Sequence, residues 1–284
     1  MGLKRMTDLE NRLVEKKMVS IGQFEHAQEE ALKINRSVWA GLVMLGYLSE
    51  KDISRFFAGE SGVPYVDIAS YRISREILSL LDKNYCIQNF VIPLFKIKNR
   101  LFVACSNPFD TGLMGALAKM SGFIIAPLIC DAHSIQGALD LYWGMDDKFF
   151  EAASFIVAPN RLRKISLWRE SERLMLTMPV TVKPKDDSVL VQSASPIAGK
   201  ACNISAKGNS AAISIPLFLP EGVKILVDFS APQTSCGLTA LGEIVHSYMD
   251  SVEQYTLGIK FIEINDVAKA KLLQIAKEGK YKQN

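Results

Sequence analysis

The chain has 284 residues, of which 49% are hydrophobic and 22% charged, with a formal net charge of +3. Length and composition suit two packed domains and exclude a mainly disordered chain. The sequence contains no apolar run of about 18 residues and no signal-peptide core, so we expect a cytoplasmic protein without membrane insertion.

Positive charge is unevenly distributed along the chain. Residues 1–150 carry 17 Lys and Arg against 17 Asp and Glu, whereas residues 151–284 carry 16 against 13. Five cations of the second half lie within 13 residues: Arg161, Arg163, Lys164, Arg169 and Arg173. This compact basic segment suits a small anionic ligand better than a DNA duplex, so we do not expect DNA binding.

The cysteines are odd in number and form no CxxC pair. This spacing predicts free thiols, mostly buried, in a reducing compartment. They are Cys86, Cys105, Cys130, Cys202 and Cys236.

The N-terminal quarter has a helical pattern. Apolar residues recur at three- and four-residue steps over 8–33 and again over 38–57, with a predicted turn at Gly46 and a helix cap at Ser49. Because Met18-Val-Ser20 and Tyr47-Leu-Ser49 are each followed by a helical pattern, we expect an internal repeat.

Strands then alternate with helices, which predicts a compact mixed α/β domain. The expected strands are 63–68, 89–95, 100–105 and 123–129, and the expected helices are 110–120 and 133–142.

The second half has a β pattern. We place a first domain at residues 1–147, a linker at 148–164, and an all-β domain at 165–284 that forms an antiparallel barrel of six or seven strands. A C-terminal helix, starting at Asn265 or Asp266, is expected to cover the barrel mouth. The expected strands are 174–182, 189–193, 200–204, 211–216, 224–229, 238–248 and 255–264.

Two short motifs lie within this β region. Arg169 and Arg173 form an RxxxR pair before the first strand, and Asn203-Ile-Ser205-Ala-Lys-Gly208 fits D/N-x-S-x-x-G. Together they resemble the signatures of PilZ domains, which are receptors for the second messenger cyclic di-GMP. The resemblance covers about residues 165–279 and implies a barrel with a C-terminal helix.

The residue chemistry suits this ligand, which carries two phosphates and two guanines. A guanidinium pairs bidentately with phosphate or a guanine edge and stacks on a base. The resemblance assigns these roles to Arg169 and Arg173, with Asn203 and Ser205 on a guanine edge. Gly208 allows a tight bend, and Trp168 offers a stacking face. The alternative is that both arginines pair with neighbouring glutamates and that 203–208 is an ordinary turn.

The first domain resembles the N-terminal domain of type II secretion and type IV pilus ATPases. The resemblance is carried mainly by Gly62-Val-Pro-Tyr-Val-Asp67, Val103-Ala-Cys-Ser-Asn-Pro108 and Ile135-Gln-Gly-Ala-Leu-Asp-Leu-Tyr142. Some members of that family bind cyclic di-GMP through two copies of RLGxxLxxxGxLxxxxLxxxLxxQ. Here both copies of this motif are altered. An acid at the arginine position would repel phosphate, and a Trp at the glycine position would fill space that Gly leaves open. We therefore expect a protein-docking role for this domain. The altered positions are Asp8, Lys17, Ser37, Trp39 and Glu60.

Catalytic patterns are incomplete in this sequence. Ala198-Gly199-Lys200-Ala201 imitates the end of a phosphate-binding loop but lacks its first Gly and its Ser or Thr. The three histidines form no metal-binding spacing, and we expect neither an enzyme, nor a metal site, nor a cofactor. The sequence thus predicts a non-catalytic cyclic di-GMP receptor that signals to a protein partner through its N-terminal domain. Two alternatives remain open: an adaptor whose barrel no longer binds nucleotide, and a barrel that binds single-stranded nucleic acid.

Overall fold

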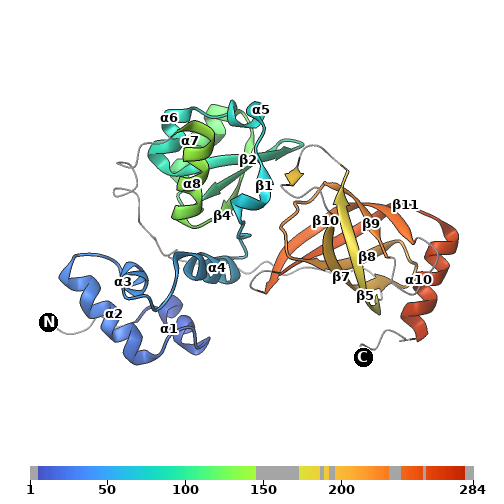
Figure 1. Ribbon diagram of the computed structural model, residues 1–284, viewed down its shortest axis with the longest axis horizontal. Helices are drawn as coiled ribbons and strands as arrows, with labels where there is room; N and C mark the ends of the chain where they lie inside the picture. The colour runs from blue at the N-terminus through green and yellow to red at the C-terminus, as the bar shows by residue number, and fades with distance from the viewer. Residues whose placement is uncertain are drawn as a thin grey trace.

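The computed structural model describes residues 6–144, 173–185, 189–191, 196–229, 238–251 and 254–278. An N-terminal part with helices and a small sheet lies beside a β-barrel (Figure 1). The mixed α/β start and the all-β second half with a C-terminal helix confirm the predicted fold class. No helix in these ranges is long and apolar enough to cross a membrane.

Four helices at the N-terminus form two copies of a helix–turn–helix unit. Their caps match, because Ser20 and Ser49 each make a capping box with the residue three positions on. The turns match as well, since Lys17 (φ 58°) and Gly46 (φ 69°) both adopt the left-handed conformation that ends a helix. The structure therefore contains the expected repeat. The separation along the sequence between corresponding residues is the same for the two caps, Ser20 and Ser49, as for the two turns, Lys17 and Gly46. The helices are α1 (Asp8–Glu15), α2 (Ile21–Lys33), α3 (Val38–Met44) and α4 (Glu50–Ser61).

A three-stranded sheet follows, in which the central strand pairs antiparallel with one neighbour and parallel with the other. Its strands are β2 (Val91–Ile97), β3 (Arg100–Cys105) and β4 (Ile124–Ile129) in the order β2-β3-β4. The helices of this part are η1 (Ile68–Ser70), α5 (Arg75–Leu78), α6 (Lys83–Asn89), α7 (Thr111–Ser121) and α8 (Ala132–Trp143).

The strand expected at 63–68 does not form as a full strand. Tyr65 makes a single bridge to Ile129, after which the chain turns into η1. The cause is local, because the Asp67 carboxylate accepts a hydrogen bond from the Ala69 N–H and caps that turn. Such side-chain capping competes with a strand ladder.

The second half closes into a six-stranded antiparallel barrel with the strand order β10-β11-β8-β7-β5-β9. Alternating burial along β5 directs every second side chain inward, as the alternating sequence pattern predicts. The strands of the barrel are β5 (Arg173–Pro184), β7 (Ile197–Ser205), β8 (Ser210–Ile215), β9 (Lys224–Asp228), β10 (Thr239–Ser251) and β11 (Gln254–Ile264).

The C-terminal helix α10 (Asp266–Glu278) packs across β5 and β7. Leu272 on this helix is fully buried and belongs to the same apolar cluster as the barrel interior. Figure 1 shows α10 at the edge of the barrel farthest from the N-terminal helices.

One expected barrel strand leaves the barrel. Of residues 189–193 the structure describes 189–191, where β6 (Leu190–Val191) pairs antiparallel with β1 (Tyr71–Arg72) of the N-terminal part. The alternating pattern of this segment predicts a strand but not its partner, because a local pattern does not specify which distant strand it pairs with. The barrel thus has six strands, and the connection between β5 and β7 links the two halves.

The two halves share one apolar core. The Tyr71 ring packs at a tilt against Phe95, with ring centroids 5.5 Å apart, and Phe95 packs in the same way against Phe102, at 5.0 Å. Phe102 then lies 6.5 Å from Phe218 of the barrel, which in turn contacts Tyr255. The Tyr71 hydroxyl donates to the Phe218 carbonyl. This cluster joins the sheet and the barrel into one packed unit.

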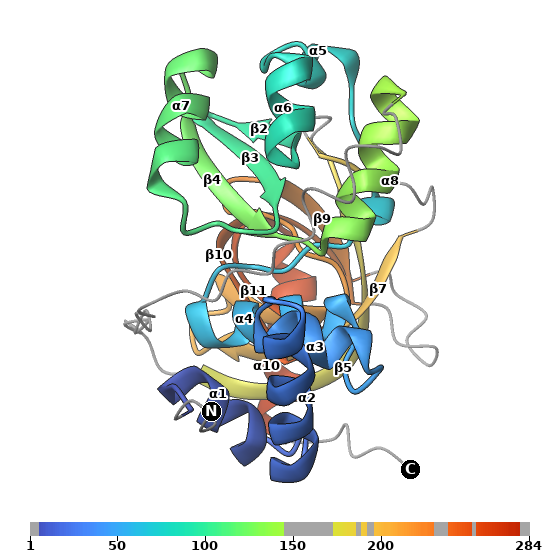
Figure 2. The same cartoon turned by 90° about the vertical axis from the view of Figure 1, so that its left-hand side faces the viewer.

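Helix α4 lies at the centre of this arrangement (Figures 1 and 2). It contacts β4 of the sheet and β10 of the barrel. At the barrel contact, a side chain at Gly59 would lie 3.7 Å from the Met249 methyl group. The helical repeat is therefore in direct contact with the barrel.

Candidate functional site

The start of β5, the end of β7 and the turn into β8 bring four of the six predicted ligand residues together. Arg173 pairs with Ser205 and Met175 pairs with Asn203 across the β5–β7 ladder. The Arg173 Nη1 donates to the Asn203 Oδ1 over 3.3 Å. Arg173 and Asn203 are both partly exposed on the outer face of the barrel. Trp168 and Arg169 lie outside the described residues.

Ser205 has a structural role within this cluster. It is 4% exposed, and its Oγ accepts hydrogen bonds from the N–H groups of Asn209 (3.1 Å) and Ser210 (3.2 Å). Its carbonyl also accepts the Gly208 N–H over 2.7 Å. The serine therefore organises the β7–β8 turn, and only its O–H donor remains for other groups.

Gly208 is required by the turn and by the helix above it. Its φ of +66° is a conformation that L side chains rarely adopt. A Cβ at this position would lie 3.0 Å from the Lys269 Cγ and 3.2 Å from the Leu273 Cδ1. The structure that lies close against this glycine is therefore α10.

Two residues of this region carry no motif signal. Met175 is 73% exposed, on the outer face of β5 and opposite Asn203. The alternation along β5 places this side chain outside the barrel and could have identified it. Lys269 lies on α10, 60 residues along the chain from Asn209, whose Oδ1 accepts its Nζ hydrogen bond over 2.8 Å. No sequence pattern connects two positions so far apart.

The altered repeat motif of the N-terminal helices is tightly packed. Trp39 is 3% exposed and contacts Phe56 and Phe57, so the position of the family glycine is filled by a core aromatic. Ser37, at the position of the family arginine, caps α3 by accepting from the Ala40 N–H.

Glu60 on α4 connects the two copies of the helical repeat through ion pairs. Its two carboxylate oxygens accept from Arg12 over 2.5 Å and from Lys16 over 2.6 Å, although Glu60 is only 5% exposed. Burial pushes the pKa of Glu60 upward, but the hydrogen bonds from Lys16 and Arg12 outweigh it and hold the pKa below its ordinary value. These two cations are therefore paired within the protein.

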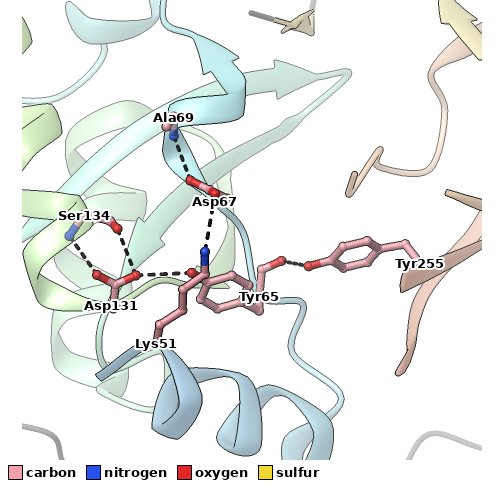
Figure 3. A network of polar contacts seen from close by, with 7 residues as sticks. All are labelled: Lys51, Tyr65, Asp67, Ala69, Asp131, Ser134 and Tyr255. Carbon is pink, nitrogen blue, oxygen red and sulfur yellow. Dashed lines mark hydrogen bonds and ion pairs between the residues drawn. The ribbon is translucent and has the colours of Figure 1, made fainter. Parts of the chain in front are cut away.

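A second polar network joins the barrel to the N-terminal part (Figure 3). The Tyr255 hydroxyl of β11 donates to the Tyr65 carbonyl, and the Tyr65 hydroxyl donates to the Asp131 carboxylate over 3.2 Å. Asp131 in turn caps α8 by accepting from Ser134. Burial raises the pKa of both tyrosine hydroxyls, so each is a neutral donor at physiological pH.

Across the described ranges, no group of three or more His, Cys, Asp or Glu side chains could hold an ion. Four cysteines are free there, with Cys86, Cys105 and Cys130 buried and Cys202 half-buried. Burial raises the pKa of the Cys86 and Cys105 thiols to about 12, which makes them poor nucleophiles at neutral pH.

Comparison with protein families identifies two domains in the expected order. The MshEN domain model matches residues 61–148, and the PilZ domain model matches residues 168–278. These matches confirm both resemblances predicted from the sequence.

A curated relative and several solved structures are also similar. The type IV pilus assembly ATPase PilB of Myxococcus xanthus is 25% identical over 131 residues, which cover 46% of this chain and 23% of PilB. The chain thus spans about a quarter of the length of that relative. A structure of MshE with cdg covers 49% of this chain and all of its own, at 23% identity and a TM-score of 0.43. The PilZ domain of CeSA, from a cellulose-synthesizing bacterium, covers 39% of this chain and all of its own, at 16% identity and a TM-score of 0.27.

Proposed function

We propose that this chain is a non-catalytic cytoplasmic receptor for cyclic di-GMP, which binds on the outer face of the barrel. The observation that carries the proposal is the Arg173–Asn203 pair beside the Ser205–Gly208 turn. A guanidinium and an amide on one exposed face can serve a phosphate and a guanine edge of the same ligand. The match of residues 168–278 to the PilZ domain model supports this assignment.

The RxxxR segment completes the proposed site. Arg169 would bind phosphate or a base, and Trp168 would stack on a base. Both residues closely precede Arg173 in the sequence. Residues 1–147, 148–164 and 165–284 remain our proposed domains and linker. The N-terminal domain would present the response to a protein partner, and its family resemblance to secretion ATPases supports a docking role.

The altered N-terminal motif is not part of the proposed ligand site. Trp39 fills the core at the glycine position, and Arg12 and Lys16 are engaged by Glu60. Opening this region to a dinucleotide would expose apolar surface and break two ion pairs. We therefore place sensing on the barrel.

A second candidate is an adaptor whose barrel has lost its ligand. Ser205 favours it, because the hydroxyl oxygen is already an acceptor for two backbone N–H groups. The two candidates differ in whether the intact chain binds the dinucleotide.

Titration calorimetry of the full chain with cyclic di-GMP decides between them. Binding that falls ten- to a thousandfold in Arg169→Ala and Arg173→Ala would support the receptor, since each hydrogen bond to a charged group contributes about 1.5–3 kcal/mol. Lys183→Ala is the matched control for loss of positive charge, because Lys183 is exposed near the other end of β5. Equal weakening by Lys183→Ala would indicate diffuse electrostatics, and no binding by the wild-type chain would favour the adaptor.

A further inference from the structure

We infer that Lys269 on α10 is a phosphate-binding residue of the barrel site. This inference rests on the proposed function and adds a cation that neither sequence motif contains. Lys269 lies over the Ser205–Gly208 turn between β7 and β8, which we call the motif turn. Its stem covers Gly208, and its ammonium donates to the Asn209 Oδ1 over 2.8 Å.

Short contacts connect Lys269 to the rest of the site. Arg173 pairs with Ser205 across the ladder, and the Ser205 hydroxyl accepts from the Asn209 N–H. Asn209 then accepts from Lys269. The helix that carries Lys269 also packs against β5 and β7, the two strands that present Arg173 and Asn203. Two cations from distant parts of the sequence therefore flank one turn.

The partner of Lys269 leaves its charge available. Asn209 is a neutral amide, and within the described ranges Lys269 makes no ion pair with a carboxylate. An ammonium has three N–H donors, so two remain after the bond to Asn209. An anionic oxygen is a stronger acceptor for them than water or an amide, and phosphate is the anion that cyclic di-GMP supplies.

The position of Lys269 along α10 is unfavourable for folding alone. It is the fourth residue of the helix, where the partial positive charge of the N-terminus opposes a cation. The acidic residue of the same turn, Asp266, makes no ion pair with Lys269 in the described structure. Its aliphatic stem could be supplied equally well by an uncharged side chain, because the contact with Gly208 involves only carbon atoms. The stem is thus explained by packing, and the ammonium, beyond its hydrogen bond to Asn209, is suited to an anionic ligand.

Lys269→Met separates the two roles, because it removes the ammonium and keeps an unbranched stem over Gly208. Lys271→Met is the matched control on the same helix, since two residues rotate the side chain by about 200°. Lys269→Arg keeps the charge. Each full-length variant is titrated with cyclic di-GMP in a calorimeter at two salt concentrations, and its Tm without ligand is measured.

We expect Lys269→Met to weaken binding roughly tenfold, the loss of about one charge-assisted hydrogen bond, and to reduce its salt dependence. Its Tm should stay within about two degrees of wild type, and Lys269→Arg and Lys271→Met should bind within about threefold of wild type. Wild-type binding with an unchanged Lys269→Met affinity would overturn the inference while leaving the proposed function intact, as would equal weakening by Lys271→Met. A folded wild-type chain that does not bind would reject the proposed function itself.

Discussion

The Tyr255 hydroxyl on β11 donates a buried hydrogen bond to the backbone carbonyl of Tyr65 (Figure 3). The same strand reaches the motif turn near its other end, where the Phe261 N–H donates to the Asn209 carbonyl over 2.9 Å. One strand of the barrel therefore contacts both the candidate ligand turn and the N-terminal domain. It physically connects the two in the described structure.

We expect Tyr255→Phe to destabilise the protein by about 1–3 kcal/mol, because the Tyr65 carbonyl is left buried without its donor. Thermal unfolding followed by circular dichroism measures the change. Tyr248→Phe on the neighbouring strand β10 is the control, since within the described residues its hydroxyl has no hydrogen bond. An equal loss of stability in both variants would show that the Tyr255 bond has no special role.

The shared aromatic cluster predicts that the two halves stabilise each other. Separated fragments 1–147 and 165–284 would expose Phe102 and Phe218, which are buried in the intact chain. We expect each fragment to unfold at a lower temperature than the full chain and to bind a hydrophobic dye. Mixing the fragments should raise the Tm and reduce dye binding. Fragments as stable as the full chain would contradict a common core.

Glu60→Gln tests the ion pairs that close the helical repeat. The pKa of Glu60 is lowered in the folded state, so its contribution is present above the unfolded value of about 4.3 and is lost as the pH falls through the folded value. Because Arg12 and Lys16 are half-exposed, we expect a loss of only about 1 kcal/mol at pH 7.

The difference in Tm between Glu60→Gln and wild type should shrink steadily below about pH 4. Melting curves between pH 3 and 7 measure it. A difference that stays constant across this range would mean that packing, and not the ion pairs, is disturbed by the substitution.

Gly208→Ala tests the contact between the motif turn and α10. Both strain at φ +66° and crowding against Lys269 and Leu273 should destabilise the protein by about 1–3 kcal/mol. Gly46→Ala is the matched control, because its φ is +69° and no atom lies within 4 Å of the added Cβ. We expect the larger loss at Gly208, together with weaker cyclic di-GMP binding. A loss at Gly208 no larger than that at Gly46 would mean that the α10 contact adapts without cost.

Periodicity and turn residues were sufficient to predict most elements of this fold from the sequence. The strand 100–105 forms with the expected bounds, and the later β segments close into a barrel because alternating side chains bury one face. The repeat of the N-terminal helices was visible in the spacing of Ser20 and Ser49, since capping depends on local sequence. These features are set by neighbours along the chain.

Partners distant in sequence were decided only by the tertiary structure. The pattern at 189–193 predicts a strand, but packing decides that β6 pairs with Tyr71–Arg72 instead of joining the barrel. The sequence places Asn203, Ser205 and Gly208 in one motif, but the fold assigns Ser205 to the turn and sets Gly208 against Lys269 of α10. A local pattern specifies which face of a segment is buried and how a turn closes. It does not specify which distant surface arrives there, because that choice depends on the complementarity of the assembled core.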